Sequence, residues 1–449
     1  MMAMHATPPA MVAPVSPRPA HRFGSMEVDL DTAALTAQPY LRAIRWVASP
    51  APVNVPVVAV LDTGVTSAAA GLQNRLNTAL ATTFVTGGNA LVDTEGHGTH
   101  VAGIIATVAS GTATSPGVSI LPVQIADGQG QTSAQALAAG IRYAVSRNAK
   151  IINLSVQGAG FSKIEQDAIN DATRAGVLVV ASSGNTGGTA KEYPGAYRHV
   201  LAVGAVDNAG QPLAESTRGL QVAIAAPGQD ISSSGNNGAT GGPRFTNRTG
   251  TSMAAAIISG VAARLLAARP TLSPSQVTEL IMGSPRPVNS GTDRARGTGV
   301  VDLVRALRAK TPVNDSAEPD DDPPNARILP ALIAKGQFQG ERYGRLRTWS
   351  DVRDGAVVHL SAGQTLTAEA VVSNRADVDM YLWRPKSPVY RGGAVFARQW
   401  LAVGAVNPGS TENLKYTAVQ AGNYVLEVRL AGATRLVRPT YHLQAQVAG

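Results

Sequence analysis

The sequence contains no cysteine. Disulfide bonds and thiolate metal ligands are therefore excluded, and the stability of the fold must come from packing. Long apolar runs are also missing, because no uninterrupted stretch approaches the roughly 18 residues that a membrane-spanning helix requires. The composition thus predicts a globular protein without a membrane span, and it leaves the redox compartment open.

The basic residues form no tract. The formal net charge is +8, from 38 Lys and Arg against 30 Asp and Glu, and the arginines lie scattered among apolar residues. A protein that binds nucleic acid usually concentrates its positive charge on one helix or face, so no nucleic acid is expected as a partner. The first 20 residues lack both a basic start and a continuous apolar core, and a signal peptide is not visible there.

The chain has 449 residues, of which 44% are hydrophobic, and this is enough for two domains with a buried core each. Residues 1–48 are Pro-rich, contain one short helical candidate, and are interpreted as an N-terminal arm or lead-in. Residues 49–310 form the first predicted domain and residues 329–449 the second. Between them, residues 311–328 combine prolines with adjacent acidic residues, which is typical of an interdomain linker.

The two predicted domains differ in their hydrophobic pattern. In the first, short apolar runs alternate with amphipathic helical segments, which predicts an α/β fold with a parallel sheet covered by helices on both faces. In the second, alternating strands are separated by turn signals, which predicts a small all-β sandwich. The strands expected in the first domain are residues 57–61, 118–125, 150–155, 177–182 and 200–206, and the helices include 133–147, 162–174 and one that begins near 273.

Three short segments supply a carboxylate, a base and a nucleophile. Asp62 ends the apolar run 57–61, His97 opens a helical segment, and Ser252 stands within Gly-Thr-Ser-Met-Ala at the start of an apolar helical run. A serine hydroxyl needs a base to take its proton, and the base needs a carboxylate that fixes its tautomer. Because one residue ends a strand and two begin helices, all three can meet at one edge of a parallel sheet.

In this order, the three segments resemble those of the subtilisin family of serine proteases. The resemblance implies a three-layer catalytic domain that hydrolyses peptide bonds through an acyl-enzyme. It implies that Asp62 orients His97 and that His97 takes the proton of Ser252. A further segment, Ser-Ser-Gly-Asn-Thr-Gly, resembles the family loop whose asparagine, here Asn185, donates a hydrogen bond to the oxyanion together with the Ser252 amide.

The same resemblance implies that an extended peptide binds as an added β-strand between two backbone segments. Gln157 stands where the family usually has glycine and is expected to narrow the floor of the peptide site. Ala256 replaces the usual proline four residues after Ser252 and removes no catalytic group. The residues implied in substrate binding are Gly128, Gln129, Gly130, Ser155, Val156, Gln157, Gly158, Ser183 and Gly184.

No cofactor follows with certainty from the residues. Calcium is possible in this family, but the acidic loop that many relatives carry after the histidine helix is absent, because residues 108–114 contain no carboxylate. A zinc site on His97 and His100 is rejected, since the glutamate of a zinc-protease helix is missing. We therefore expect His100 to be a structural histidine. Arg248 either lines the leaving-group side of the peptide site or faces solvent.

The second domain resembles the pre-peptidase C-terminal domain of secreted bacterial proteases. The resemblance rests on residues 363–366, 377–382 and 417–424, where Asp377 and Asp379 are expected to be exposed carboxylates. It implies a secreted bacterial enzyme. Protein or peptide substrates and a monomeric state are also expected.

Two other functions stay open. A narrow-specificity processing protease or macrocyclase would use the same residues, and in a macrocyclase an amine would intercept the acyl-enzyme. Gln157 is compatible with such a narrow substrate specificity. A catalytically silent binding protein would keep the fold, although every catalytic position is filled.

Overall fold

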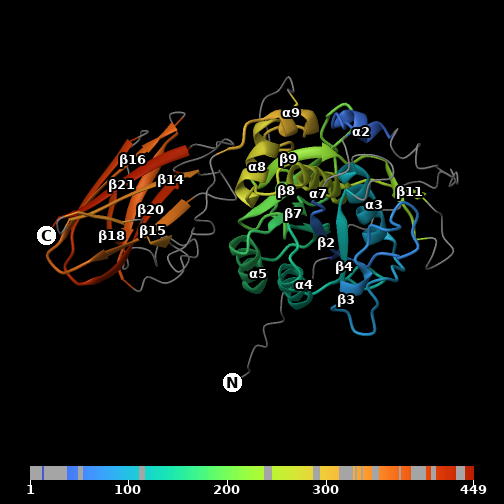
Figure 1. Ribbon diagram of the computed structural model, residues 1–449, viewed down its shortest axis with the longest axis horizontal. Helices are drawn as coiled ribbons and strands as arrows, with labels where there is room; N and C mark the ends of the chain where they lie inside the picture. Colours follow the sequence, from blue (N-terminus) through green and yellow to red (C-terminus); the bar gives the residue numbers. More distant parts are fainter. Residues whose placement is uncertain are drawn as a thin grey trace. The chain divides into compact units, whose positions relative to one another are not determined.

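The computed structural model divides the chain into two compact units, residues 1–314 and 315–449, which are described separately (Figure 1). The aspartates of the predicted linker lie outside the described residues. The structure describes residues 13–14, 38–48, 54–110, 117–236, 245–286, 294–312, 327–328, 331–334, 337–345, 353–373, 376–385, 401–405, 411–430 and 440–448.

The first unit is built on a seven-stranded sheet in which every neighbouring pair of strands is parallel. Apart from the short edge strand β3, almost every residue of the sheet is buried, as expected for apolar runs that are covered on both faces. In spatial order the strands are β3 (Thr82–Thr83), β4 (Ser119–Gln124), β2 (Val57–Asp62), β5 (Ile151–Leu154), β7 (Leu178–Ser182), β8 (Val200–Val206) and β9 (Val222–Pro227).

Helices lie on both faces of the sheet and complete three layers (Figure 1). Val58 and Val60 of β2 share one core with α3 and α7, whereas Ala59 and Leu61 share another with α4 and α5. Alternate residues of the strand therefore face opposite layers. The structure confirms the predicted three-layer α/β fold. The helices are α2 (Pro39–Ala43), η1 (Thr78–Leu80), α3 (His97–Ala109), α4 (Ala134–Ser146), α5 (Lys163–Arg174), α7 (Thr251–Ala268), α8 (Pro274–Gly283) and α9 (Leu303–Arg308).

The buried face of α5 differs from the predicted apolar stripe. The spacing of Ile164, Ile169 and Ala172 predicts that stripe. Ile169 and Ala172 are buried, but Ile164 is 40% exposed and Glu165 is buried instead. The Tyr197 hydroxyl donates to Glu165 at 2.7 Å. A hydrogen-bond donor makes the burial of this carboxyl group tolerable, and no sequence periodicity reveals such a donor.

Helix α7 is the central core helix of the first unit. Within the described part of the chain, it alone has the length and hydropathy of a candidate membrane span, with a mean hydropathy of 1.6 over 18 residues. However, 89% of that window is buried inside the protein. Its apolar character is therefore explained by packing against the sheet and α3.

Part of the predicted lead-in packs onto the first unit. Tyr40, Leu41 and Ile44, in and beside α2, are buried in the same core as α3 and α7. Farther upstream, β1 (Ala13–Pro14) pairs in antiparallel fashion with β6 (Val156–Gln157). A two-stranded antiparallel sheet of β10 (Ile231–Ser234) and β11 (Phe245–Arg248) precedes α7.

The second unit is a β-sandwich. Its sheets have the orders β12-β15-β20-β17-β18 and β13-β14-β21-β16-β19, and residues of both sheets share one hydrophobic core. This confirms the predicted β-rich second domain, while its resemblance to the pre-peptidase domain stays a prediction. The strands are β12 (Arg327–Ile328), β13 (Ala331–Ala334), β14 (Gln337–Arg345), β15 (Arg353–Leu360), β16 (Thr365–Val372), β17 (Val378–Trp383), β18 (Leu401–Ala405), β19 (Thr411–Thr417), β20 (Gly422–Leu430) and β21 (Thr440–Ala448).

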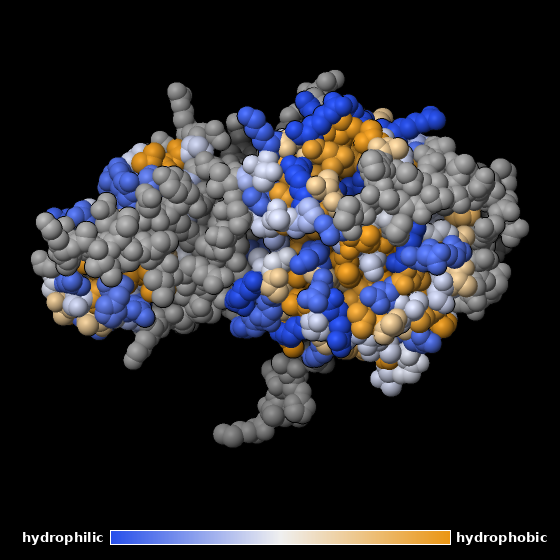
Figure 2. All heavy atoms as spheres, in the orientation of Figure 1, coloured by the Kyte–Doolittle hydropathy of each residue, from blue (hydrophilic) through white to orange (hydrophobic). Residues whose placement is uncertain are grey.

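The surface of the first unit has a mixed character. On the face shown in Figure 2, blue hydrophilic residues lie scattered among orange hydrophobic ones.

Candidate active site

Strand β2 and helix α3 bring Asp62 and His97 into contact. Asp62 is the last residue of β2 and His97 the first of α3, and His97 Nδ1 lies 2.8 Å from Asp62 Oδ1. Both side chains are buried. Gly98 permits the close approach, because a Cβ at this position would overlap the Gly64 carbonyl and press on the Asp62 side chain.

The surroundings of His97 shift its pKa. Burial is the largest single influence and lowers the pKa, but the charge of Asp62 and its hydrogen bond together outweigh it, so the pKa lies above the ordinary value of 6.5. Arg248 lowers the pKa and Glu95 raises it, and these two residues pair at 3.1 Å. Arg248 is therefore paired with Glu95 and contributes to the electrostatic surroundings of His97.

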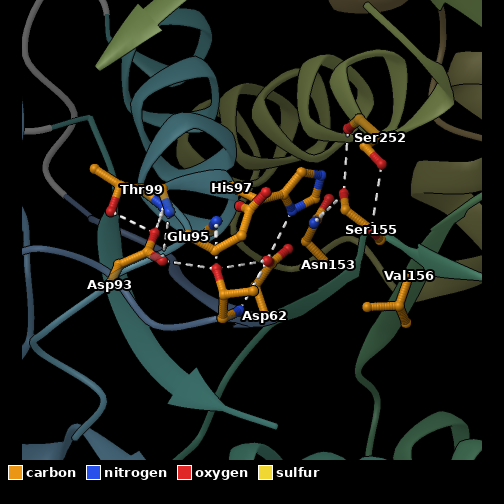
Figure 3. A network of polar contacts seen from close by, with 12 residues as sticks. Asp62, Asp93, Glu95, His97, Thr99, Asn153, Ser155, Val156 and Ser252 are labelled. Carbon is orange, nitrogen blue, oxygen red and sulfur yellow. Dashed lines mark hydrogen bonds and ion pairs between the residues drawn. The ribbon is translucent and has the colours of Figure 1, made fainter. Parts of the chain in front are cut away.

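A second buried carboxylate, Asp93, holds the segments of Asp62 and His97 together by hydrogen bonds. It accepts hydrogen bonds from Thr63 Oγ1 at 2.9 Å, from the Gly96 amide at 2.8 Å, and from the Thr99 amide and hydroxyl at 2.8 and 2.7 Å. Asp93 thus ties the residue after Asp62 to the first turn of α3 (Figure 3). The sequence reasoning missed it, although its position four residues before His97 was a usable signal, since carboxylates favour helix N-termini.

Ser252 lies at the N-terminal end of α7, where it meets β5 and the residue after it. Its Oγ donates to the Ser155 carbonyl at 3.2 Å, and Ser155 Oγ donates to the Ser252 carbonyl at 3.1 Å. Figure 3 shows the His97 ring between Asp62 and Ser252. Nε2 of His97 is buried and has no hydrogen-bond partner among the described residues. Rotation about one side-chain bond redirects the Ser252 hydroxyl. Catalytic hydrogen bonds often become short and well aligned only when substrate is bound.

The side-chain amide of Asn185 has a defined orientation. Its Oδ1 accepts the backbone N–H of Thr251 at 2.9 Å and the Thr251 hydroxyl at 3.0 Å. Because a backbone N–H can only donate, the atom it contacts must be the oxygen, and Nδ2 faces the other way. Nδ2 is buried and without a partner among the described residues. Nδ2 can therefore donate a hydrogen bond to a group beside the N-terminus of α7, where the helix dipole also favours negative charge.

Strand β6 and the loop of Asn185 lie side by side. The backbone N–H of Asn185 donates to Gln157 Oε1 at 2.9 Å, and Ser182 Oγ donates to the Val156 carbonyl at 3.2 Å. Gly158 exchanges two backbone hydrogen bonds of 2.8 Å with Tyr193. The structure therefore brings the predicted substrate segment 155–158 next to Asn185, the residue predicted to hold the oxyanion.

The remaining predicted substrate residues occupy two places. The Ser183 hydroxyl donates to the Thr217 carbonyl, and the Gly184 carbonyl accepts the Thr217 amide at 2.9 Å, so both residues belong to the wall beside Asn185. Gly128, Gln129 and Gly130 lie in the turn after β4, where Gly128 and Gln129 are exposed and Gly130 is buried, and Gly128 lies close to Thr94. No hydrogen bond between this turn and β6 is found in the described ranges.

His100 is a packed histidine one helical turn after His97. Its Nε2 lies 3.0 Å from the carbonyls of both Ile231 and Thr246, so it is the donating nitrogen. Burial, followed by the charges of Arg248 and His97, lowers its pKa to about 3. The ring is neutral at physiological pH and holds β10 and β11 against α3.

No group of three or more His, Cys, Asp or Glu side chains with the spacing of a metal site is found in the part of the chain that the structure describes. Residues 111–114 of the loop after α3, on which the calcium prediction rests, lie outside it. The calcium content stays a prediction.

The family model of the subtilases matches residues 54–299. The chain is 35% identical over 254 residues to a thermostable alkaline protease of Halalkalibacterium halodurans, which covers 56% of this chain and 67% of that protein. It is 31% identical over 258 residues to subtilisin DY of Bacillus licheniformis, which covers 90% of the latter. A cell wall-associated protease of Bacillus subtilis is 37% identical over 232 residues, which are only 25% of its length.

A solved structure gives the same fold. The crystal structure of a lanthipeptide protease superposes with a TM-score of 0.51 and 24% identity, over 56% of this chain and 87% of that one. At this identity the likeness concerns the fold alone. The family match over more than half of the sequence, together with the relatives that are 31% and 35% identical, establishes that the chain belongs to the subtilase family and is a subtilisin-like serine endopeptidase.

Proposed function

We propose that this enzyme cleaves peptide bonds with Ser252 as nucleophile and His97 as base. Asp62 orients the imidazole and stabilises its protonated form, and Asn185 with the Ser252 amide holds the oxyanion. The observation that carries the proposal is the pair of unpartnered atoms, His97 Nε2 and Asn185 Nδ2, which are both buried beside the start of α7. One can accept the serine proton, and the other can donate to an oxyanion.

The chemical steps follow from these roles. Ser252 Oγ forms a bond to the peptide carbonyl carbon while its proton passes to His97 Nε2. The C–N bond then breaks, and the amine leaves with that proton, which yields an acyl-enzyme. Water attacks the ester, gives a proton to His97, and releases the acid as the proton returns to Ser252 Oγ. The first N–H groups of a helix lack partners within the helix, so the Ser252 amide is available to the oxyanion.

Substrate binding by strand addition is supported by β6. Its edge accepts β1 in antiparallel pairing, with Pro14 opposite Val156 and Ala13 opposite Gln157. An extended substrate bound in the same way is held through its main chain, which tolerates many sequences. We propose protein or peptide substrates for this edge and a monomeric enzyme.

Narrow specificity is favoured by one contact. The Gln157 side chain spans from β6 to the Asn185 amide and reduces the space available there to a substrate side chain. A processing protease or macrocyclase is therefore the second candidate. Product mass spectra separate the two, because a macrocyclase releases cyclic peptides and a protease releases hydrolysed ends.

The test is labelling with a fluorophosphonate together with casein cleavage. Wild type and the surface control Ser146→Ala are expected to label and to cleave, whereas Ser252→Ala is expected to do neither. Casein cleavage by Ser252→Ala at the wild-type rate would contradict the proposal, and an unlabelled wild type would favour a silent binding protein.

The cellular setting and ions are also proposals. The names of the relatives include a cell wall-associated protease and several alkaline proteases of bacteria. We propose an extracellular bacterial enzyme without a required cofactor. Retention of activity after exhaustive treatment with a calcium chelator is the expected result.

A further inference from the structure

We propose that Glu192 selects substrates with arginine or lysine at the P1 residue, whose carbonyl is attacked. The inference rests on the proposed protease function and names the substrate class of the same site. Glu192 is only 6% exposed, and none of the catalytic steps uses its carboxylate.

Glu192 lies against the loop that carries the oxyanion donor. Its Oε1 accepts the hydroxyl of Thr186 at 2.6 Å and also that of Thr217. Gly184 has a φ of +108°, and a Cβ there would overlap the Glu192 carboxylate. The carboxylate therefore rests directly on the backbone of the residue before Asn185.

The pairing of β1 with β6 indicates where a P1 side chain enters. With Pro14 opposite Val156 and Ala13 opposite Gln157, the next residue of a strand in this register lies opposite Ser155. The Ser155 carbonyl is 3.2 Å from Ser252 Oγ, so that residue presents its own carbonyl to the nucleophile.

The P1 side chain then extends between two walls, residues 155–158 and 183–185. These walls are joined by the hydrogen bond from the Asn185 amide to Gln157. Behind them, Gly158 pairs with Tyr193, the residue after Glu192. The Glu192 carboxylate therefore lies against one wall at Gly184 and, through Tyr193, beside the end of the other wall, where a long P1 side chain would end.

The charge of Glu192 lacks a counter-ion among the residues that the structure describes. Its two hydrogen bonds come from neutral hydroxyls and both reach Oε1. A buried carboxylate without a cation is costly, and a guanidinium or ammonium group can form strong charge-assisted hydrogen bonds to it. Because the two threonines fix Oε1, the carboxylate is held in place for such a side chain.

The test is a peptide library that varies only the P1 residue, with the enzyme concentration set by active-site titration. For wild type, kcat/KM with P1 arginine or lysine is expected to exceed that with leucine or phenylalanine at least about 10-fold. Glu192→Gln is expected to lower the value for arginine about 10- to 100-fold, the range for a lost hydrogen bond to a charged group, and to leave leucine nearly unchanged. The charge-matched control Asp171→Asn, on the exposed side of α5, is expected to keep the wild-type ratio.

Two results would overturn the proposal. One is a wild-type profile without preference for basic residues, which needs no variant and is decisive even where Glu192→Gln does not fold. The other is an equal loss on all substrates in Glu192→Gln. Fluorophosphonate labelling of each protein separates these outcomes from a failure of the protease function itself, because labelling of Ser252 does not depend on P1.

Discussion

Gln157 and Asn185 are joined by a hydrogen bond of 2.9 Å from the backbone amide of Asn185 to the side-chain oxygen of Gln157. A glycine at position 157 has no side chain and cannot accept this bond. Gln157 therefore has two effects, because it occupies space beside β6 and also fixes the backbone of the residue proposed to hold the oxyanion. It is a positioning residue for Asn185.

Gln157→Gly is expected to lower kcat about 2- to 10-fold on a small peptide substrate. The lost hydrogen bond contributes about 0.5–1.5 kcal/mol, and the looser Asn185 stabilises the transition state less well. Gln157→Glu retains an acceptor oxygen and is expected to preserve more of kcat. Steady-state kinetics with separate kcat and KM checks this. If Gln157→Gly changes only KM, Gln157 acts by occupying space and does not position Asn185.

Asn185→Leu is expected to lower kcat about 100- to 1,000-fold with little change in KM, which is the known cost of losing such a donor in subtilisin. The physical reason is that Nδ2 meets charge only in the transition state. Thr251→Val, which removes one of the two donors that hold Asn185 Oδ1, is expected to cause a smaller loss. A raised KM with intact kcat in Asn185→Leu would argue for a ground-state binding role.

Asp93→Asn is expected to destabilise the first unit by about 1–3 kcal/mol. Asp93 accepts four hydrogen bonds, and an asparagine turns an NH₂ group toward at least one of these donors. Urea unfolding in a Ser252→Ala background prevents self-digestion and measures the difference. Asp207→Asn is the control, because its carboxylate accepts amides in an exposed turn. Equal effects of the two substitutions would refute a bracing role.

The rise of kcat/KM with pH reports the pKa of the free catalytic base. We expect its midpoint above 6.5, because Asp62 raises the His97 pKa by more than burial lowers it. Arg248 lowers this pKa, so Arg248→Gln is expected to move the midpoint to higher pH. Glu95→Gln is expected to move it to lower pH. Midpoints that shift in the same direction in both variants would exclude this electrostatic account.

His100 makes stability fall in acid. Its pKa is about 3 in the folded protein against an ordinary 6.5, so only the unfolded chain takes a proton as the pH falls from 6.5 toward 3. The stability associated with neutral His100 is present above pH 6.5 and is lost below it, by about 2 kcal/mol between pH 7 and pH 5. His100→Gln can still donate to the two carbonyls but does not titrate. In a Ser252→Ala background, it is expected to lose about 2 kcal/mol less than its parent over this range, and identical losses would contradict the prediction.

The sequence predicted the fold of the first unit from local signals. Val58 to Leu61 form an uninterrupted apolar run, and such a run in alternation with amphipathic helices leaves few solutions besides a parallel sheet covered on both faces. Ile164 shows where this reasoning fails. Its spacing fits an apolar stripe, but the hydroxyl of Tyr197 makes burial of the neighbouring Glu165 acceptable instead.

The candidate site was predicted only in part, for a related reason. Asp62, His97, Asn185 and Ser252 belong to short segments that are informative in themselves. Asp93 and Glu192 are single carboxylates whose neighbours in the chain say nothing about their partners. Asp93 accepts a hydrogen bond from Thr63, 30 positions away, and Glu192 accepts one from Thr217, 25 positions away.

The sequence by itself determined the order of layers, the family and the four residues that carry the proposed chemistry, because these depend on local periodicity and on short segments. Only the tertiary structure decided which atoms are left without partners, that Gln157 holds the Asn185 amide, and that Glu192 is buried behind Gly184. These features depend on contacts between segments that are distant in the chain, and such contacts are fixed by packing of the whole unit rather than by any local pattern.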